Sequence, residues 1–223
     1  MVAKYGGLDA ALAAAGGRID SARQTLYYCD VAFNQKSPQH LRHVLHASTY
    51  VYVAAAMEAF LRESCEGLVE EINGSGVLLK DLRLSLFAVV QGPRLQALQT
   101  HRGLKKWDQR AVLFQAVSSS TSCALDSAHM PIDGHTIRPS HLDALWAVLG
   151  LPGLSAPGPR HQLALTDLAD NRNAVAHGDE DAAAVAGRKG VPDTLRLLDR
   201  IDEVVLHIYY AMAEYLDQQA YRR

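Results

Sequence analysis

Apolar residues recur at intervals of three and four along most of this chain, which is the spacing of one face of an α-helix. The clearest stripe runs from Leu41 to Ile72, and a second runs from Leu195 to Tyr215. No segment shows the strict alternation of apolar and polar residues that is typical of a strand. The pattern therefore predicts an all-α bundle with a long early helix and a long C-terminal helix.

Glycine and proline positions predict where the helices begin and end. The glycine pair at 16–17 divides a short alanine-rich helix from a second helix over 19–33. Ser37 is the expected N-cap of the long early helix and Pro38 its first residue, and Asn-Gly-Ser-Gly at 73–76 ends that helix. Further helices are predicted over residues 79–91, 104–117, 139–149, 162–177 and 192–218. The remaining stretches are expected to be irregular, and the longest are 118–139, 154–160 and 179–191.

The composition is that of an ordinary globular domain. The 223 residues are 48% hydrophobic and 21% charged, and this length suits one sizeable core. A net charge of −2 argues against indiscriminate coating of nucleic acid but leaves room for a local basic site. Cys29, Cys65 and Cys123 have no paired spacing, so we expect buried thiols in a reducing compartment.

The sequence indicates neither secretion nor a membrane segment. No apolar run approaches the roughly 18 to 20 residues that span a bilayer. Lys4 is not followed by a continuous apolar stretch before the glycine pair at 16–17, so no signal peptide is predicted. We expect a cytoplasmic protein that does not bind a membrane.

Residues 170–178, Asp-Asn-Arg-Asn-Ala-Val-Ala-His-Gly, carry the most distinctive chemistry in the chain. On a helix, Arg172 and His177 lie about 140° apart, while Asn173 and His177 are an i, i+4 pair on one face. Histidine exchanges protons near neutral pH, and arginine is a permanent cation matched to phosphate oxygens. The set therefore fits metal-free chemistry on a phosphate. Taken alone, it is also typical of a helix end with a glycine cap.

In the context of a helical bundle, Arg172-Asn173-x-x-x-His177-Gly178 resembles the Arg-polar-x-x-x-His signature of the HEPN superfamily. The chain looks closest to the stand-alone bacterial RiboL-PSP-HEPN-like proteins. The helix over 41–72, with its small-apolar-Glu-x-aromatic pattern near 55–61, is similar to the long early helix of that group. Residues 140–151 are similar to the short helix before the motif helix, and the final helix also has a counterpart.

The resemblance covers roughly residues 38–217. It implies a single HEPN-like domain over 1–223, with 1–36 as an N-terminal helical extension and 118–139 as an insertion. Carried over by position, Arg172 and His177 are the catalytic residues and Asn173 is the polar residue of the motif. Glu58 lies where acidic residues of the early helix support the site in some HEPN proteins.

The chemistry expected of these residues is RNA cleavage without a metal. The ribose 2′-hydroxyl attacks the adjacent phosphate and leaves a 2′,3′-cyclic phosphate and a 5′-hydroxyl. The step needs a base, an acid and positive charge on the phosphate. One His177 in each chain cannot fill both proton-transfer roles at once. The resemblance implies a homodimer, whose two-fold axis brings two motifs together.

Four cations near the motif are candidates for holding RNA: Arg188, Lys189, Arg196 and Arg200. Arg196 and Arg200 are an i, i+4 pair and share a helix face. The alternative is a solvated helix face on which these cations pair with Asp199, Asp202 and Glu203.

No metal site and no nucleotide cofactor is indicated. His40, His43 and His46 drift around the helix and lack the company of cysteine or carboxylate ligands. Gly74-x-Gly76 has neither the strand nor the lysine of a phosphate-binding loop.

Three functional hypotheses follow. The favoured one is a HEPN-type endoribonuclease acting as a toxin or an anti-phage, abortive-infection effector, restrained by an antitoxin of the nucleotidyltransferase type. The second is a non-catalytic HEPN-like module that binds RNA, nucleotide or a protein partner. The third is a purely structural bundle, in which Arg172→Ala and His177→Ala would change only stability.

Overall fold

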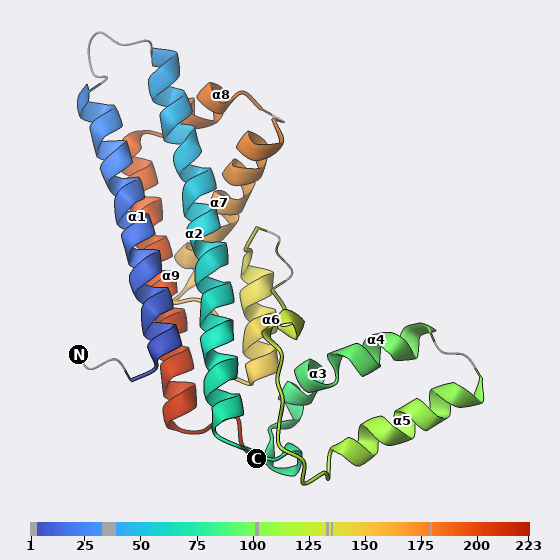
Figure 1. The fold of residues 1–223 in the computed structure, drawn as a ribbon. Coiled ribbons are helices and arrows are strands. Elements are labelled where there is room, and N and C mark those ends of the chain that lie inside the picture. Colours follow the sequence, from blue (N-terminus) through green and yellow to red (C-terminus); the bar gives the residue numbers. More distant parts are fainter. Residues whose placement is uncertain (1–3, 33–38, 101–102, 133, 135, 179) are drawn as a thin grey trace.

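The structure is a computed structural model that describes residues 4–32, 39–100, 103–132, 134, 136–178 and 180–223. Long helices run side by side as a bundle, and a hairpin of two shorter helices projects from one end (Figure 1). The bundle helices are α1 (Gly6–Ala32), α2 (Gln39–Gly74), α6 (Pro139–Leu149), α7 (Pro159–His177), α8 (Ala182–Gly187) and α9 (Val191–Asp217). Between α2 and α6 lie α3 (Phe87–Val90), α4 (Gly92–Thr100), α5 (Leu104–Ala116) and three single 3-10 turns at Leu79–Asp81, Leu84–Leu86 and Ser127–His129. The described ranges contain two isolated β-bridges and no named strand, which confirms the all-α prediction.

The core lies where α1, α2 and α9 pack along one another. Phe60 and Leu68 of α2 and Ile201 and Ile208 of α9 are each 0% exposed. Near one end, α1 and α2 cross so closely that a Cβ added to Gly67 would lie 3.0 Å from the carbonyl carbon of Gly7. This crossing needs glycine because the atoms in the way belong to backbone.

The apolar character of α2 is explained by its place in the bundle. By length and mean hydropathy the helix could cross a membrane, although polar residues interrupt its apolar runs. However, 56% of its most apolar window is buried inside the fold. It contacts α1, α7, α8 and α9 along its length, as a central helix of a bundle does.

The predicted break at the glycine pair 16–17 is wrong, because α1 continues through it. Ala15 and Ile19 on either side are buried in the core, at 0% and 1% exposure. Each glycine costs a helix interior up to about 1 kcal/mol, and burial of the flanking apolar stripe offsets that cost. The predicted cap and first residue of the next helix, Ser37 and Pro38, lie outside the described residues.

The predicted helix over 79–91 is also wrong. The segment forms two 3-10 turns and the short α3, because three of its backbone donors bond to distant segments and interrupt the helical series. The Leu79 amide donates to the Thr121 carbonyl at 2.9 Å, and the Arg83 amide donates to the Tyr221 carbonyl at 2.7 Å. The buried leucines have a spacing that suits a helix, but here they anchor an irregular segment in the core.

Two short helices were not predicted. Gly92–Thr100 forms α4 next to the predicted α5. Within 179–191, which the sequence indicated as irregular, Ala182–Gly187 forms α8. The Asp181 carboxylate caps α8 by accepting from the Ala183 amide at 2.8 Å, and Val185 is buried at 1% exposure. The other predicted helices agree with α2, α5, α6, α7 and α9 to within a few residues.

Candidate functional site

The motif occupies the last turns of α7. Pro159 starts the helix at a position where a missing N–H costs nothing. Leu165 and Leu168 bury one side of it in the core. Gly178 ends it with a φ of 70°, in the left-handed region. His177 is therefore the last helical residue, at the rim of the bundle.

Asn173 is the structural centre of the motif. Its side-chain Oδ1 accepts one hydrogen bond from Arg172 Nη1 at 3.1 Å and another from Thr136 Oγ1 at 3.0 Å. Two donors occupy both lone pairs of this oxygen, so the amide orientation is set and Arg172 is tethered beside it. Arg172 and Asn173 are both half-buried.

Thr136 is the residue that the sequence did not single out. It is 8% exposed and lies near the end of the 118–139 segment, which carried no predicted role in the site. A second contact binds the same segment to α7, since Arg138 pairs with Asp170 at 2.7 Å. The segment is therefore joined to the motif helix at two points.

Asp170, Asn173 and His177 lie at i, i+3 and i+7, so they share one face of α7. His177 is exposed. Its imidazole forms no hydrogen bond or ion pair with another residue of the described ranges. Arg172 lies about 140° around the helix from it and is half-buried. The end of α7 thus presents an Arg172–Asn173 pair joined by a hydrogen bond and, one turn further on, an exposed imidazole.

Glu58 of α2 lies beneath the segment that carries Thr136. It lines a cavity of about 350 Å³ together with Arg62, Gly134 and Ile137. No residue of α7 lines that cavity, so Glu58 adjoins the supporting segment of the site. Its assigned role stays a prediction.

Three of the four cations that were predicted to hold RNA are paired with carboxylates. Arg188 pairs with Glu180, and Lys189 pairs with Asp167. Arg196 pairs with Asp193 at 2.5 Å. These partners differ from those that the alternative named.

Asp199 and Asp202 instead bind Arg23 of α1, at 3.1 and 2.9 Å, and Glu203 binds His161 at 2.5 Å. Arg200 lines a cavity of about 450 Å³ with Lys189, Arg196 and Asp167. Asp167 lies about 120° around α7 from Asn173. Asp167 lies about 80° around the helix from His177, so this cavity lies to one side of the Asn173–His177 face.

A groove of about 650 Å³ lies on the other flank of the motif helix. Val175 contributes from α7, and the remaining walls come from α1 and α2, among them Thr25, Tyr52 and Ala55. Tyr52 is 47% exposed, and Tyr28 of α1 is 64% exposed. The end of α7 is thus bordered by an accessible and largely apolar surface.

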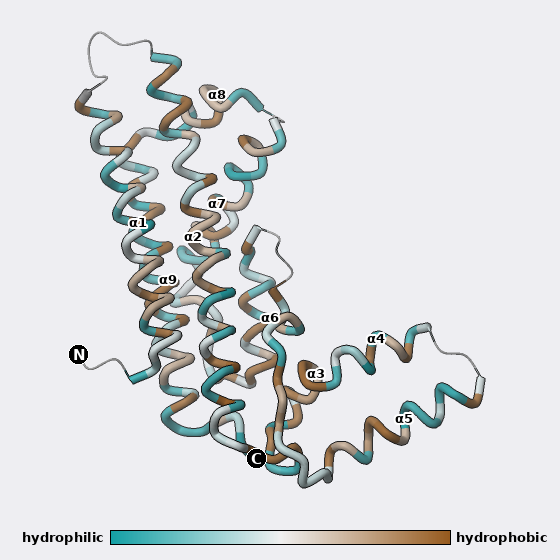
Figure 2. Tube along the Cα trace, viewed as in Figure 1, coloured by the Kyte–Doolittle hydropathy of each residue, from teal (hydrophilic) through white to brown (hydrophobic). Residues whose placement is uncertain are grey.

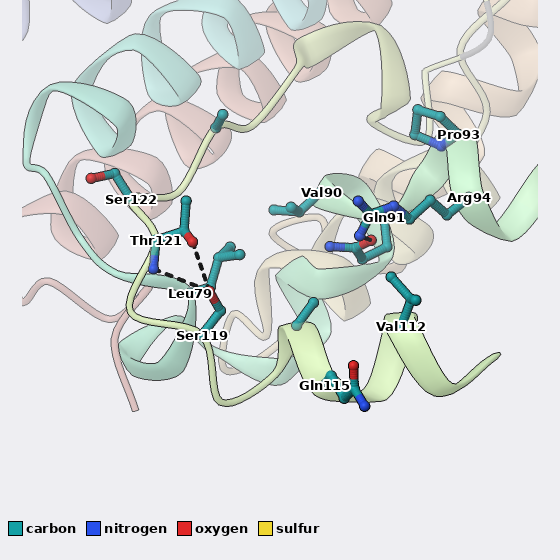
Figure 3. Close-up of a pocket in the computed structure, with 12 residues that line it drawn as sticks. Leu79, Val90, Gln91, Pro93, Arg94, Val112, Gln115, Ser119, Thr121 and Ser122 are labelled. Carbon is teal, nitrogen blue, oxygen red and sulfur yellow. Dashed lines mark hydrogen bonds between the residues drawn. The ribbon is translucent and has the colours of Figure 1, made fainter. Parts of the chain in front are cut away.

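Another cavity, of about 570 Å³, lies at the base of the projecting hairpin. Figure 3 shows Gln91 and Arg94 on one side of it and Ser119 and Thr121 on another. Arg94 Nη1 donates to Gln91 Oε1 at 3.1 Å. No residue of the motif lines this cavity.

Titrating groups in the core are held neutral. His46 is buried, its Nε2 lies 2.6 Å from Thr194 Oγ1, and burial lowers its pKa to about 4. Burial also raises the pKa of the Cys65 thiol to about 12 and that of Cys123 to about 11. All three cysteines, including Cys29, are free and buried, as predicted.

A helical bundle that ends one helix on Arg-Asn-x-x-x-His defines a protein of the HEPN class. The model of the HEPN_MAE_28990-like HEPN family matches residues 19–221, and the chain belongs to that family. The narrower likeness to the RiboL-PSP-HEPN group stays a prediction, because the matched family has a different description. No curated protein and no solved structure matches the chain.

Proposed function

We propose that this protein is an endoribonuclease that cleaves RNA by 2′-hydroxyl attack and leaves 2′,3′-cyclic phosphate and 5′-hydroxyl ends. The observation that carries the proposal is the Arg172–Asn173–Thr136 arrangement, next to an exposed His177, in a chain of the HEPN class. A structural helix end has no need for an arginine tethered by an amide that a second segment holds in place.

Each side chain has a role in this reaction. The Arg172 guanidinium binds a non-bridging phosphate oxygen and stabilises the charge that develops there. Asn173 positions Arg172, and Thr136 positions Asn173 through the hydrogen bonds at 3.1 and 3.0 Å. His177 transfers a proton to or from the ribose or leaving oxygen.

The active form is proposed to be a homodimer with a composite cleft. Two copies of His177 supply the base and the acid, and two copies of Arg172 flank the phosphate. The groove of about 650 Å³ beside Val175, lined in part by the exposed Tyr52, offers a second copy an apolar surface adjoining the motif. A two-fold interface uses the same patch on both subunits. A fully active monomer would contradict this arrangement.

An unrestrained ribonuclease damages its own cell, so we further propose a toxin or abortive-infection role under control of an antitoxin of the nucleotidyltransferase type. This proposal rests on the likeness to other HEPN proteins. The alternative, a non-catalytic module that binds RNA, nucleotide or protein through the same surface, predicts binding without cleavage.

The test compares cleavage of total RNA and a labelled tRNA pool by wild type, Arg172→Ala and His177→Ala. Matched controls are Arg160→Ala and His40→Ala, which remove exposed residues of the same types. Arg160 lies on the same helix, about 18 Å along its axis from Arg172. Loss of cleavage in both motif variants, with folding and dimerisation intact and the controls active, is the expected result.

Equal activity in motif and control variants would refute the catalytic assignment. Absence of cleavage by dimeric wild type across these RNA pools would favour the binding module.

A further inference from the structure

The hairpin of α4 and α5 stands away from the bundle (Figure 1). No described residue of either helix is buried. Both helices nevertheless carry apolar as well as polar residues (Figure 2). Its large apolar side chains are exposed as follows: Leu95 40%, Leu104 84%, Trp107 65%, Val112 40% and Phe114 72%. Such exposure in a chain with a well-formed core indicates a binding surface.

The same hairpin is strongly basic. Residues 92–116 contain five lysines and arginines and a single acid, Asp108, which is a net charge of +4. Since the chain as a whole carries −2, the remainder carries −6. Arg94, Lys105, Lys106 and Arg110 form no ion pair with other residues that the structure describes. These cations therefore remain available to an anionic partner, unlike three of the four cations beside the motif.

Aromatic and basic groups alternate on one face of α5. Trp107, Arg110 and Phe114 lie at i, i+3 and i+7, which places them on neighbouring rows of the helix. The Arg110 Cζ lies 4.8 Å from the centroid of the Trp107 ring, as in a cation–π contact. A guanidinium flanked by two exposed aromatic rings can bind a phosphate while the rings stack with bases.

We propose that the α4–α5 hairpin binds single-stranded RNA, with the backbone on Arg94, Lys105, Lys106 and Arg110 and bases stacked on Trp107 and Phe114. The choice of RNA as the ligand rests on the proposed function. The hairpin would supply affinity for RNA that the paired cations near the motif do not. A hairpin that docks only onto protein needs apolar side chains but has no need for a charge of +4 in an acidic chain. The charge favours a polyanion.

The test measures, by fluorescence anisotropy, the binding of a fluorescein-labelled single-stranded RNA of about 20 nucleotides. The salt concentration is varied between about 50 and 300 mM, because binding through phosphate contacts weakens with salt over this range. All proteins carry His177→Ala, so that the RNA stays intact. The hairpin variant combines Arg94→Gln, Lys105→Gln, Lys106→Gln and Arg110→Gln. A second variant combines Trp107→Leu and Phe114→Leu, which keeps the apolar surface and removes the stacking rings.

The matched control removes four cations near the motif: Arg188→Gln, Lys189→Gln, Arg196→Gln and Arg200→Gln. Because each phosphate contact on a single strand contributes about 0.7 to the salt slope, the hairpin variant is expected to reduce that slope by about 3. Its affinity at low salt should fall about tenfold or more, and that of the aromatic variant about fivefold or more. The control should change both quantities less.

Equal effects of the hairpin and control variants would overturn the proposal, as would absence of RNA binding by the parent protein. A hairpin variant that alters only the oligomeric state, measured by light scattering, would identify a protein-contact surface instead. RNA binding through the hairpin without cleavage by wild type would refute the ribonuclease and leave this inference standing.

Discussion

The buried His46 makes stability depend on pH in a calculable way. Its Nε2 lies 2.6 Å from Thr194 Oγ1, and the Tyr50 hydroxyl lies 3.0 Å from the same oxygen. Burial first, and then the charges of His43 and Arg42, lower the pKa of His46 to about 4. In the unfolded chain an ordinary histidine has a pKa of about 6.5. The unfolded state therefore binds a proton before the native state does as the pH falls.

The sign and size of the effect follow from linkage. Stability is unaffected by His46 above about pH 6.5, falls as the pH drops towards about 4, and changes no further below that. The full loss from pKa values of 6.5 and about 4 is about 3 kcal/mol, of which about 2 kcal/mol is reached by pH 5. Acidification to pH 5 should therefore destabilise the protein through this one buried imidazole.

Urea unfolding followed by circular dichroism at pH 7.5 and pH 5.0 measures this term. The reference is His46→Gln, whose amide still reaches Thr194 but does not titrate in this range. Wild type should lose about 2 kcal/mol more than the variant between the two pH values, because the other histidines contribute equally to both. Equal losses would refute the reasoning, as would a His46 resonance that titrates near pH 6.5 in the folded protein.

Two further pairs of substitutions test the packing and the site. Gly67→Ala should cost about 1–3 kcal/mol in urea unfolding, because its Cβ would lie 3.0 Å from the Gly7 backbone. The control is Gly17→Ala in α1, where the added atom meets open space, and it should raise the free energy of unfolding by about 0.5–1 kcal/mol. Equal destabilisation by Gly67→Ala and Gly17→Ala would contradict a close crossing at Gly67. Thr136→Val removes the donor to Asn173 and should cost about 1 kcal/mol and slow cleavage, whereas Thr136→Ser should retain both. A Thr136→Val protein with unchanged cleavage would remove Thr136 from the site.

The long helices α2 and α9 were predictable because each carries an extended apolar stripe with the helical period. The segment over 79–91 has the same residue types, yet its amides bond to Thr121 and Tyr221. Those partners are remote in sequence, so local periodicity does not reveal them. At the glycine pair 16–17 a break was predicted where the helix continues, because tertiary packing around Ile19 outweighs the local preference of glycine.

The motif itself was predictable from spacing, since Arg172, Asn173 and His177 lie on one helix. Thr136 was not, because nothing local marks a threonine in an irregular segment as a partner of Asn173. The basic hairpin did leave a signal in the sequence, as a charge of +4 over 92–116. The whole-chain charge of −2 concealed it, and a count over shorter windows would have found it.

The chemistry of the product ends decides whether Arg172 and His177 cleave RNA through the 2′-hydroxyl. Wild-type protein is incubated with RNA in EDTA, and the 3′ and 5′ ends of the fragments are identified by mass spectrometry. We expect 2′,3′-cyclic phosphate and 5′-hydroxyl ends with wild type and neither with His177→Ala. Fragments with 3′-hydroxyl and 5′-phosphate ends, or the same cyclic ends from folded His177→Ala, would contradict it.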